Sequence, residues 1–88
     1  MSSRYLAFDL GAESGRAMLG RLADDRVTLK ELCRFSNEPV RSHGSLQWDI
    51  LRLWLEMRRG LNLVDSRDGP LDSIGVDTWG CDFALLGE

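Results

Sequence analysis

The sequence predicts an α/β fold that consists of a three-stranded antiparallel meander, a crossover helix and a parallel fourth strand. Three observations predict it: a continuous apolar run near the start, two more strand-like runs joined by short turns, and one stretch of helical periodicity before a last apolar run. A connection that contains a helix returns the chain to a strand parallel with an earlier one. With 88 residues, the chain is at most one domain.

The first two strands are separated by a glycine-containing turn. Residues 5–8 form a continuous apolar run, which is typical of a strand covered on both faces. Asp9 ends this run, and Gly11 allows the chain to turn. Residues 16–22 then favour a second strand, which ends at the polar turn 23–26.

The third strand is predicted over residues 27–35 and is followed by a loop. By alternation, one face of this strand would carry four apolar residues, with Glu31 as an interruption. These four residues are Val27, Leu29, Cys33 and Phe35. Residues 36–46 are rich in polar and turn-forming residues and are predicted to form a loop, with His43 at its surface.

Helical periodicity begins after Asp49, whose carboxylate is predicted to cap the helix. Trp48, just before it, is interpreted as an anchor for the helix start. Gly60 weakens a helix by about 1 kcal/mol relative to alanine, which leaves an interruption open at that point. Turn-forming residues 66–70 end the segment. The predicted buried stripe consists of Ile50, Leu53, Trp54, Met57, Leu61 and Val64.

Residues 71–76 are predicted to form the fourth strand, and residues 82–86 are a candidate for the start of a fifth. If the fourth strand lies beside the first, Asp9 and Asp77 emerge at the same edge of the sheet. Ligands bind at this edge in open α/β sheets. This convergence is the central structural expectation.

Composition and charge argue against several classes of protein. The net charge is −3 and no cluster of Lys or Arg is longer than Arg58-Arg59, which weighs against binding of nucleic acid. No apolar stretch approaches the roughly 20 residues that a membrane span needs, and no signal peptide is recognisable. Cys33 and Cys81 lack a metal-binding spacing and are expected to be reduced thiols. We therefore expect a cytoplasmic protein that binds neither nucleic acid nor membranes.

The segment from Asp9 to Arg16 has the chemistry of a phosphate-binding hairpin. Gly11 and Gly15 bracket the turn and could let the backbone approach phosphate oxygens closely. Ser14 offers a hydroxyl donor and Arg16 a fork of N–H donors, while Asp9 could hold hydrated Mg²⁺ through water. The pattern is neither a Walker A loop nor GxGxxG. Taken alone, the pattern is explained better by a tight hairpin with an arginine at its surface.

The segment 77–83 contains the residue types of a sugar site. A carboxylate can accept hydrogen bonds from hydroxyl groups, an aromatic face can stack on C–H groups, and a glycine permits close approach of the backbone. Asp77 or Asp82, Trp79 and Gly80 supply these types. The structural alternative is a strand end whose tryptophan joins the core and whose aspartates cap turns.

These two segments, DLGAESGR and DTWGCDF, resemble the FGGY family of carbohydrate kinases, and within it the rhamnulokinase group. The resemblance implies a ribonuclease H-like, actin-like ATPase fold. Residues 1–88 would be the N-terminal part of the first domain, with the second domain absent.

The resemblance also implies roles for individual residues. Ala12, Glu13, Ser14, Gly15 and Arg16 match the segment that contacts ATP in this group, and Gly80 matches a glycine that contacts the sugar. A carboxylate beside phosphates is repulsive, so the side chain of Glu13 is expected to point to solvent while its backbone N–H serves. Asp9 is assigned to Mg²⁺. The predicted sugar wall consists of Asp77, Trp79, Gly80 and Asp82.

For the intact protein, the resemblance implies transfer of the γ-phosphoryl group of ATP to the 1-hydroxyl group of L-rhamnulose. In this family the catalytic base and the adenosine-binding lobe come from later segments. We therefore assign no catalytic residue within residues 1–88, and we expect this piece alone to be inactive. Its partners would be a sugar, a nucleotide and the rest of the kinase chain.

Three alternatives are left open. The protein could be an FGGY kinase for another ketose or polyol, or a catalytically inactive binding fragment. A more remote alternative is a ribonuclease H-like nuclease, whose metal site would use Asp9, Glu56 and Asp77. The acidic balance and the Gly/Ser/Arg hairpin weigh against the nuclease.

Overall fold

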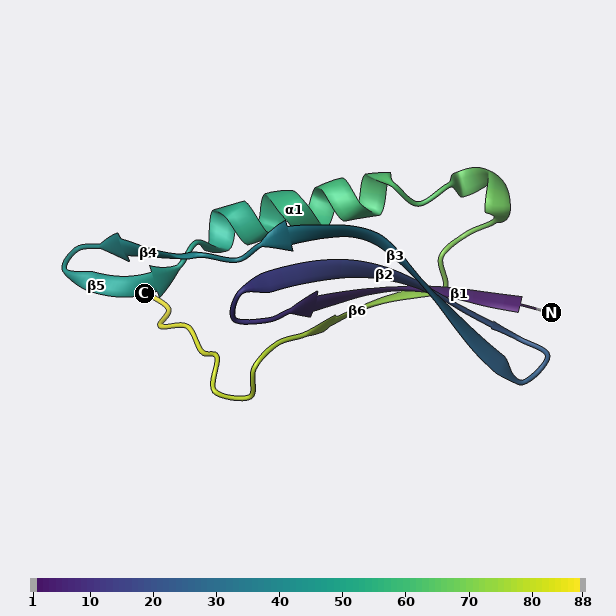
Figure 1. Cartoon of the computed structure of the whole chain (residues 1–88), viewed down its shortest axis with the longest axis horizontal. Coiled ribbons are helices and arrows are strands. Elements are labelled where there is room, and N and C mark those ends of the chain that lie inside the picture. The colour runs from purple at the N-terminus through teal and green to yellow at the C-terminus, as the bar shows by residue number, and fades with distance from the viewer. Residues whose placement is uncertain (1, 88) are drawn as a thin grey trace.

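The computed structural model describes residues 2–87 and contains a four-stranded sheet, a two-stranded sheet and one long helix (Figure 1). The strand order in the larger sheet is β3-β2-β1-β6, and the smaller sheet pairs β4 with β5. In chain order the elements are β1 (Ser2–Leu10), β2 (Ser14–Ala23), β3 (Arg26–Ser36), β4 (Pro39–Ser42), β5 (Ser45–Trp48), α1 (Ile50–Asn62), a 3₁₀ turn (Ser66–Asp68) and β6 (Ser73–Asp77).

The larger sheet has the predicted topology. β2 pairs antiparallel with both β1 and β3, whereas β6 returns after the helix and pairs with β1 in parallel. In this register Asp9 lies opposite Arg16 on one side and opposite Asp77 on the other. The α/β class and the order strand–strand–strand–helix–strand are therefore confirmed. The shared edge of Asp9 and Asp77 is confirmed as well.

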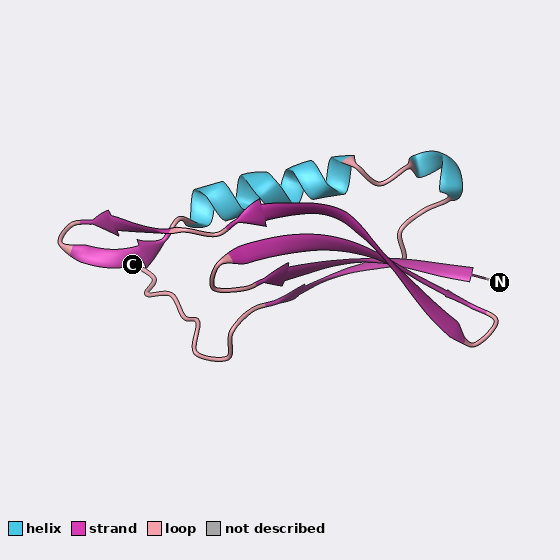
Figure 2. Ribbon diagram, viewed as in Figure 1, coloured by secondary structure: helices cyan, strands magenta, loops and turns pink. Residues whose placement is uncertain are grey.

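The helix lies along one face of the sheet (Figure 2). Side chains alternate between the faces of a strand, so Leu6, Phe8 and Leu10 of β1 all lie on one face and are buried. Two apolar clusters result, one around Leu6, Phe8 and Ala17 and one formed by Leu10, Phe35 and Leu53. Met57 of α1 packs against both clusters and so joins them.

The buried stripe of α1 is narrower than predicted. Leu53 is buried and Met57 is partly buried, but Ile50, Trp54 and Leu61 are exposed. The surface of α1 that contacts the sheet is narrow, and the helix comes closest to the sheet near Gly60. Apolar residues on either side of this narrow surface are therefore exposed. The sequence pattern gives the width of an apolar stripe but not the width of the surface beneath it.

Gly60 sets how closely α1 approaches the sheet. A β-carbon at this position would lie 2.9 Å from the β-carbon of Ala17 and 3.0 Å from the ring of Phe8. The helix runs unbroken through Gly60 and ends at Asn62. The predicted cap is also present, because the carboxylate of Asp49 accepts a hydrogen bond of 3.1 Å from the backbone N–H of Arg52. No helix within residues 2–87 has the length and apolar character to cross a membrane.

A β-bulge in β3 overturns the predicted apolar face of that strand. Ala17 pairs with Cys33 but the next residue, Met18, pairs with Glu31, so Leu32 is an extra residue. One extra residue reverses which face the following side chains occupy. Cys33 and Phe35 therefore pack towards the helix, whereas the earlier apolar residues of the strand, Val27 and Leu29, are exposed.

Two further predictions are wrong. The predicted loop 36–46 contains most of the β4–β5 hairpin, which turns at His43 and Gly44 with φ angles of +52° and +78°. Paired positive φ angles suit a two-residue hairpin turn, and this signal is hard to recognise when histidine occupies the first position. Residues 82–86 form no strand, because the chain turns away after β6 (Figure 1).

The close approach at Gly60 leads to a stability prediction. Gly60→Ala should destabilise the fold by about 1–3 kcal/mol, because the clash with Ala17 and Phe8 exceeds the gain in helix propensity. Urea denaturation followed by circular dichroism measures the change. Arg58→Ala, at an exposed position of the same helix, is the control and should leave stability nearly unchanged. A stabilised Gly60→Ala variant would contradict the close contact of Gly60 with Ala17 and Phe8.

Candidate functional site

A row of charged residues lies across the end of the sheet. Arg16, Asp9 and Asp77 occupy paired positions on β2, β1 and β6. Nη2 of Arg16 donates a hydrogen bond of 2.5 Å to Oδ2 of Asp9, and the two side chains are 40% and 43% exposed. This hydrogen bond and the charge of Asp9 raise the pKa of Arg16 above its ordinary value, which keeps the guanidinium charged. Asp77 is exposed beside this pair.

The turn between β1 and β2 presents backbone N–H groups. The N–H of Gly11 donates to the carbonyl of Ser14 at 2.9 Å, which closes the turn. Within residues 2–87, the N–H groups of Ala12 and Glu13 donate no hydrogen bond. The Glu13 side chain is exposed, as expected for a carboxylate at such a turn. Two adjacent free N–H groups are suited to bind an anion.

Asn37, which lies within the predicted loop 36–46, holds this turn. Its side-chain Nδ2 donates to the carbonyl of Gly11 at 2.7 Å, and its backbone N–H donates to the carbonyl of Glu13 at 2.9 Å. The residue is only 6% exposed. A buried asparagine directly after a strand is the signal that could have drawn attention to it, because buried amides normally have hydrogen-bond partners.

Gly15 has a packing role. A β-carbon on Gly15 would clash with Cε2 and Cζ at the edge of the Phe35 ring, which comes from β3. The ring is buried with Leu10 and Leu53. The absence of a side chain at Gly15 therefore makes room for the ring of Phe35.

The second motif, the segment 77–83, begins at the last residue of β6 and is open to solvent. Gly80 has nothing within 4 Å of the place where a β-carbon would be, and Trp79 is 53% exposed. A turn forms here, because the N–H of Asp82 donates to the carbonyl of Trp79 at 3.0 Å. Trp79 thus does not join the core, contrary to the structural alternative for this segment.

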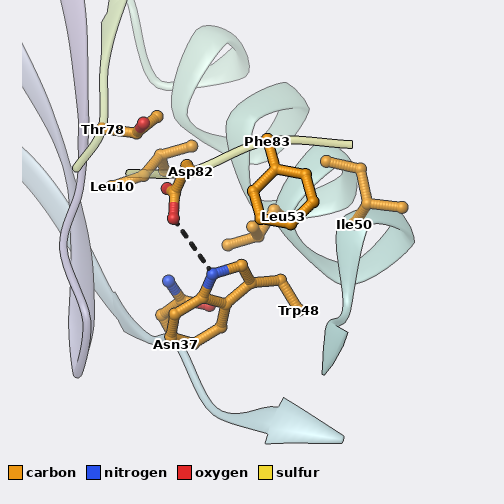
Figure 3. A pocket seen from close by; sticks show the side chains of 8 residues that line it. All are labelled: Leu10, Asn37, Trp48, Ile50, Leu53, Thr78, Asp82 and Phe83. Atoms are coloured by element: carbon orange, nitrogen blue, oxygen red, sulfur yellow. Dashed lines mark hydrogen bonds between the residues drawn. The ribbon is translucent and has the colours of Figure 1, made fainter. Parts of the chain in front are cut away.

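A small cavity of about 240 Å³ connects the second motif to the helix start and to Asn37. Its one hydrogen bond between lining side chains runs from Nε1 of Trp48 to Oδ1 of Asp82, at 3.2 Å (Figure 3). Besides the predicted role of Trp48 as an anchor for the helix start, this hydrogen bond links Trp48 to the segment 77–83. The cavity is smaller than the ~300–1,000 Å³ of most small-molecule sites, so it is at most part of one. It is lined by Leu10, Asn37, Trp48, Ile50, Leu53, Thr78, Asp82 and Phe83.

The carboxylates do not gather as the nuclease alternative requires. Glu56 lies on α1, where its Oε1 accepts hydrogen bonds from Arg52 and Arg59 at 3.0 and 2.9 Å. Asp9 alternates with the buried residues of β1 and lies on the face away from α1. Within residues 2–87, no three side chains of His, Cys, Asp or Glu are grouped so that they could hold a metal ion. This arrangement contradicts the nuclease alternative.

The chain is similar to several curated rhamnulokinases. It is 43% identical to the rhamnulokinase of Bacteroides thetaiotaomicron over 88 residues, which is all of this chain and 18% of that protein. It is 47% identical to the rhamnulokinase of Yersinia pestis over 83 residues, or 92% of this chain and 17% of the relative. For the rhamnulokinase of Pectobacterium carotovorum the identity is 45% over 85 residues, again 17% of its length. No protein-family model matches the chain.

The contact between Gly15 and Phe35 leads to a double-mutant prediction. Gly15→Ala should lower the free energy of unfolding by about 1–3 kcal/mol, because the ring must move. In a Phe35→Leu background the same substitution should cost less, with a coupling of about 0.5–3 kcal/mol. Urea denaturation of the four proteins measures the coupling. Gly75→Ala, where a β-carbon meets nothing within 4 Å, is the control. Strictly additive effects would show that the ring and the glycine are independent.

Proposed function

By sequence the chain belongs to the rhamnulokinases, and we propose that it forms the N-terminal part of the first domain of an ATP-dependent carbohydrate kinase. The observation that carries this proposal is the 43% identity over 88 residues, an alignment that includes both motifs. The chain spans only 17–18% of the length of these relatives. The catalytic base and the adenosine site would then come from outside residues 1–88.

We propose that the phosphates of ATP bind at the turn formed by residues 12–16. The free N–H groups of Ala12 and Glu13 support this, because they are donors without a competing acceptor. Arg16 adds a charged fork of donors at the same end of the sheet. Ser14 and Gly15 complete the segment, the first through its hydroxyl group and the second by letting Phe35 support the turn.

Asp9 would hold hydrated Mg²⁺. A single carboxylate suits this ion, because Mg²⁺ keeps several waters and takes its other ligands from the phosphates. In the structure, Asp9 and Arg16 form an ion pair. On binding, Asp9 would exchange the guanidinium for the hydrated cation, and Arg16 would exchange the carboxylate for phosphate oxygens. After the exchange, Asp9 and Arg16 would each still have a partner of opposite charge. Nucleotide and Mg²⁺ would therefore bind together.

The second motif would form one wall of the sugar site. Gly80 leaves space for close approach, and the half-exposed ring of Trp79 can stack on C–H groups. Asp77 and Asp82 can accept hydrogen bonds from hydroxyl groups, although one oxygen of Asp82 already accepts from Trp48. The proposed substrate is L-rhamnulose, phosphorylated on its 1-hydroxyl group.

In this reaction ATP supplies the γ-phosphoryl group, and Mg²⁺ neutralises the charge on the phosphates. The residues of this chain would bind and orient both substrates and would contribute no acid or base. The site of action would be the cytoplasm. The free thiols of Cys33 and Cys81 fit this reducing compartment.

A coupled assay for ADP release by the full-length protein tests the function. With Mg-ATP and a panel of ketoses and polyols, we expect turnover on L-rhamnulose. Gly80→Trp should abolish it, because the indole would fill the space beside the second motif. Thr28→Trp, at the far end of β3, is the matched control and should retain activity. Activity on a different sugar alone would support the proposed kinase activity but contradict L-rhamnulose as the substrate. No turnover on any sugar would contradict the kinase activity itself.

The role of Arg16 is tested by nucleotide binding. Arg16→Ala should weaken binding of Mg-ADP by roughly 10–100-fold, the range expected when charge-assisted hydrogen bonds are lost. Arg16→Lys should fall in between, because it keeps the charge but not the fork. Isothermal titration calorimetry measures the Kd. Arg21→Ala, at an exposed position of the same strand, is the control. An unchanged Kd for Arg16→Ala would show that Arg16 does not contribute to nucleotide binding.

A further inference from the structure

We propose that Asn37 is a positioning residue that orients the β1–β2 turn for phosphate binding. The inference rests on the proposed function, because it assumes that the turn binds the phosphates of a nucleotide. It concerns a residue outside segment 9–16 that touches no substrate itself. Its effect would be to fix the direction in which the N–H group of Ala12 points.

The hydrogen bonds of the turn separate its donors from its acceptors. The carbonyl oxygens of Gly11 and Glu13 both accept from Asn37, and the carbonyl of Ser14 accepts from Gly11. The N–H groups of Ala12 and Glu13 have no partner within residues 2–87. An anion is attracted by N–H groups and repelled by carbonyl oxygens. With the carbonyls of Gly11, Glu13 and Ser14 engaged, the turn offers an anion more free donors than it otherwise would.

Planarity of the peptide unit explains how one side chain controls this. The carbonyl of Gly11 and the N–H of Ala12 belong to the same planar, trans peptide and point in opposite directions. The 2.7 Å hydrogen bond from Nδ2 of Asn37 therefore aims the N–H of Ala12 away from Asn37. A peptide next to glycine rotates easily, because glycine tolerates most backbone angles. Without Nδ2, this peptide could turn its carbonyl towards the anion.

The core holds Asn37 in place. Phe35, two residues earlier, is buried with Leu10 and Leu53, and its ring lies against Gly15. Asn37 itself is 6% exposed and lines the cavity that also contains Trp48 and Asp82 (Figure 3). It thus lies between the phosphate turn and the second motif. Its hydrogen bonds to the turn are made by a residue that is already ordered, which lowers the entropic cost of ordering the turn.

Calorimetry with Mg-ADP and steady-state kinetics of the full-length protein test this role. Asn37→Ala should raise the Kd of Mg-ADP and the KM for ATP by roughly tenfold, as expected when a buried carbonyl loses its donor. The KM for the sugar should change less than about twofold. Asn62→Ala, at the exposed end of α1, is the matched control and should behave like the wild type. An unchanged Kd in a folded Asn37→Ala protein would overturn the inference.

A second variant keeps the test decisive if Asn37→Ala does not fold. Asn37→Asp keeps the shape, and its protonated carboxyl group can donate to Gly11 whereas its ionised form repels the carbonyl and the phosphates. Relative to the wild type at each pH, its affinity for Mg-ADP should therefore fall as pH rises through the pKa of the new carboxyl group. A ratio that does not vary with pH would contradict the role of Nδ2. Failure of the wild type to bind Mg-ADP would instead reject the proposed function.

Discussion

The pairing register of β1 is the constraint on which the rest of the structure depends. This strand pairs with β2 on one side and β6 on the other, so its register determines which residues face each other across the sheet. Burial fixes the register, because a shift of one residue would place Asp9 in the core and Phe8 in solvent. The same pairing that buries Leu6 and Phe8 aligns Arg16, Asp9 and Asp77. The pairing that forms the sheet therefore also brings these three side chains into one row.

The end of β3 supports the turn that the register has placed. Phe35 contacts the turn through Gly15, and Asn37 contacts it through Gly11 and Glu13. Phe35 also packs with Leu53 of α1. A small change in the position of the helix would therefore reach the turn through a single aromatic ring. The turn is thus attached to the hydrophobic core through the end of β3.

The sequence was sufficient to predict the order of the strands and helix that form the larger sheet and its cover, the cap at Asp49 and the shared edge of Asp9 and Asp77, because each follows from local periodicity or from chain connectivity. It was not sufficient where the outcome depends on contacts between distant residues. The bulge at Leu32 depends on the partner strand, and the narrow contact of α1 depends on the sheet beneath it. The contacts of Asn37 likewise depend on distant residues, since an asparagine after a strand is most often an ordinary turn residue.

The open side of β6 has a consequence for how this chain behaves in concentrated solution. Within the described residues β6 is the last strand of the sheet, so the backbone groups on its outer side have no partner, and Ile74 and Val76 are each 52% exposed. An unprotected edge strand with apolar side chains is a template for intermolecular β-pairing. These 88 residues should be prone to self-association unless another strand covers that edge.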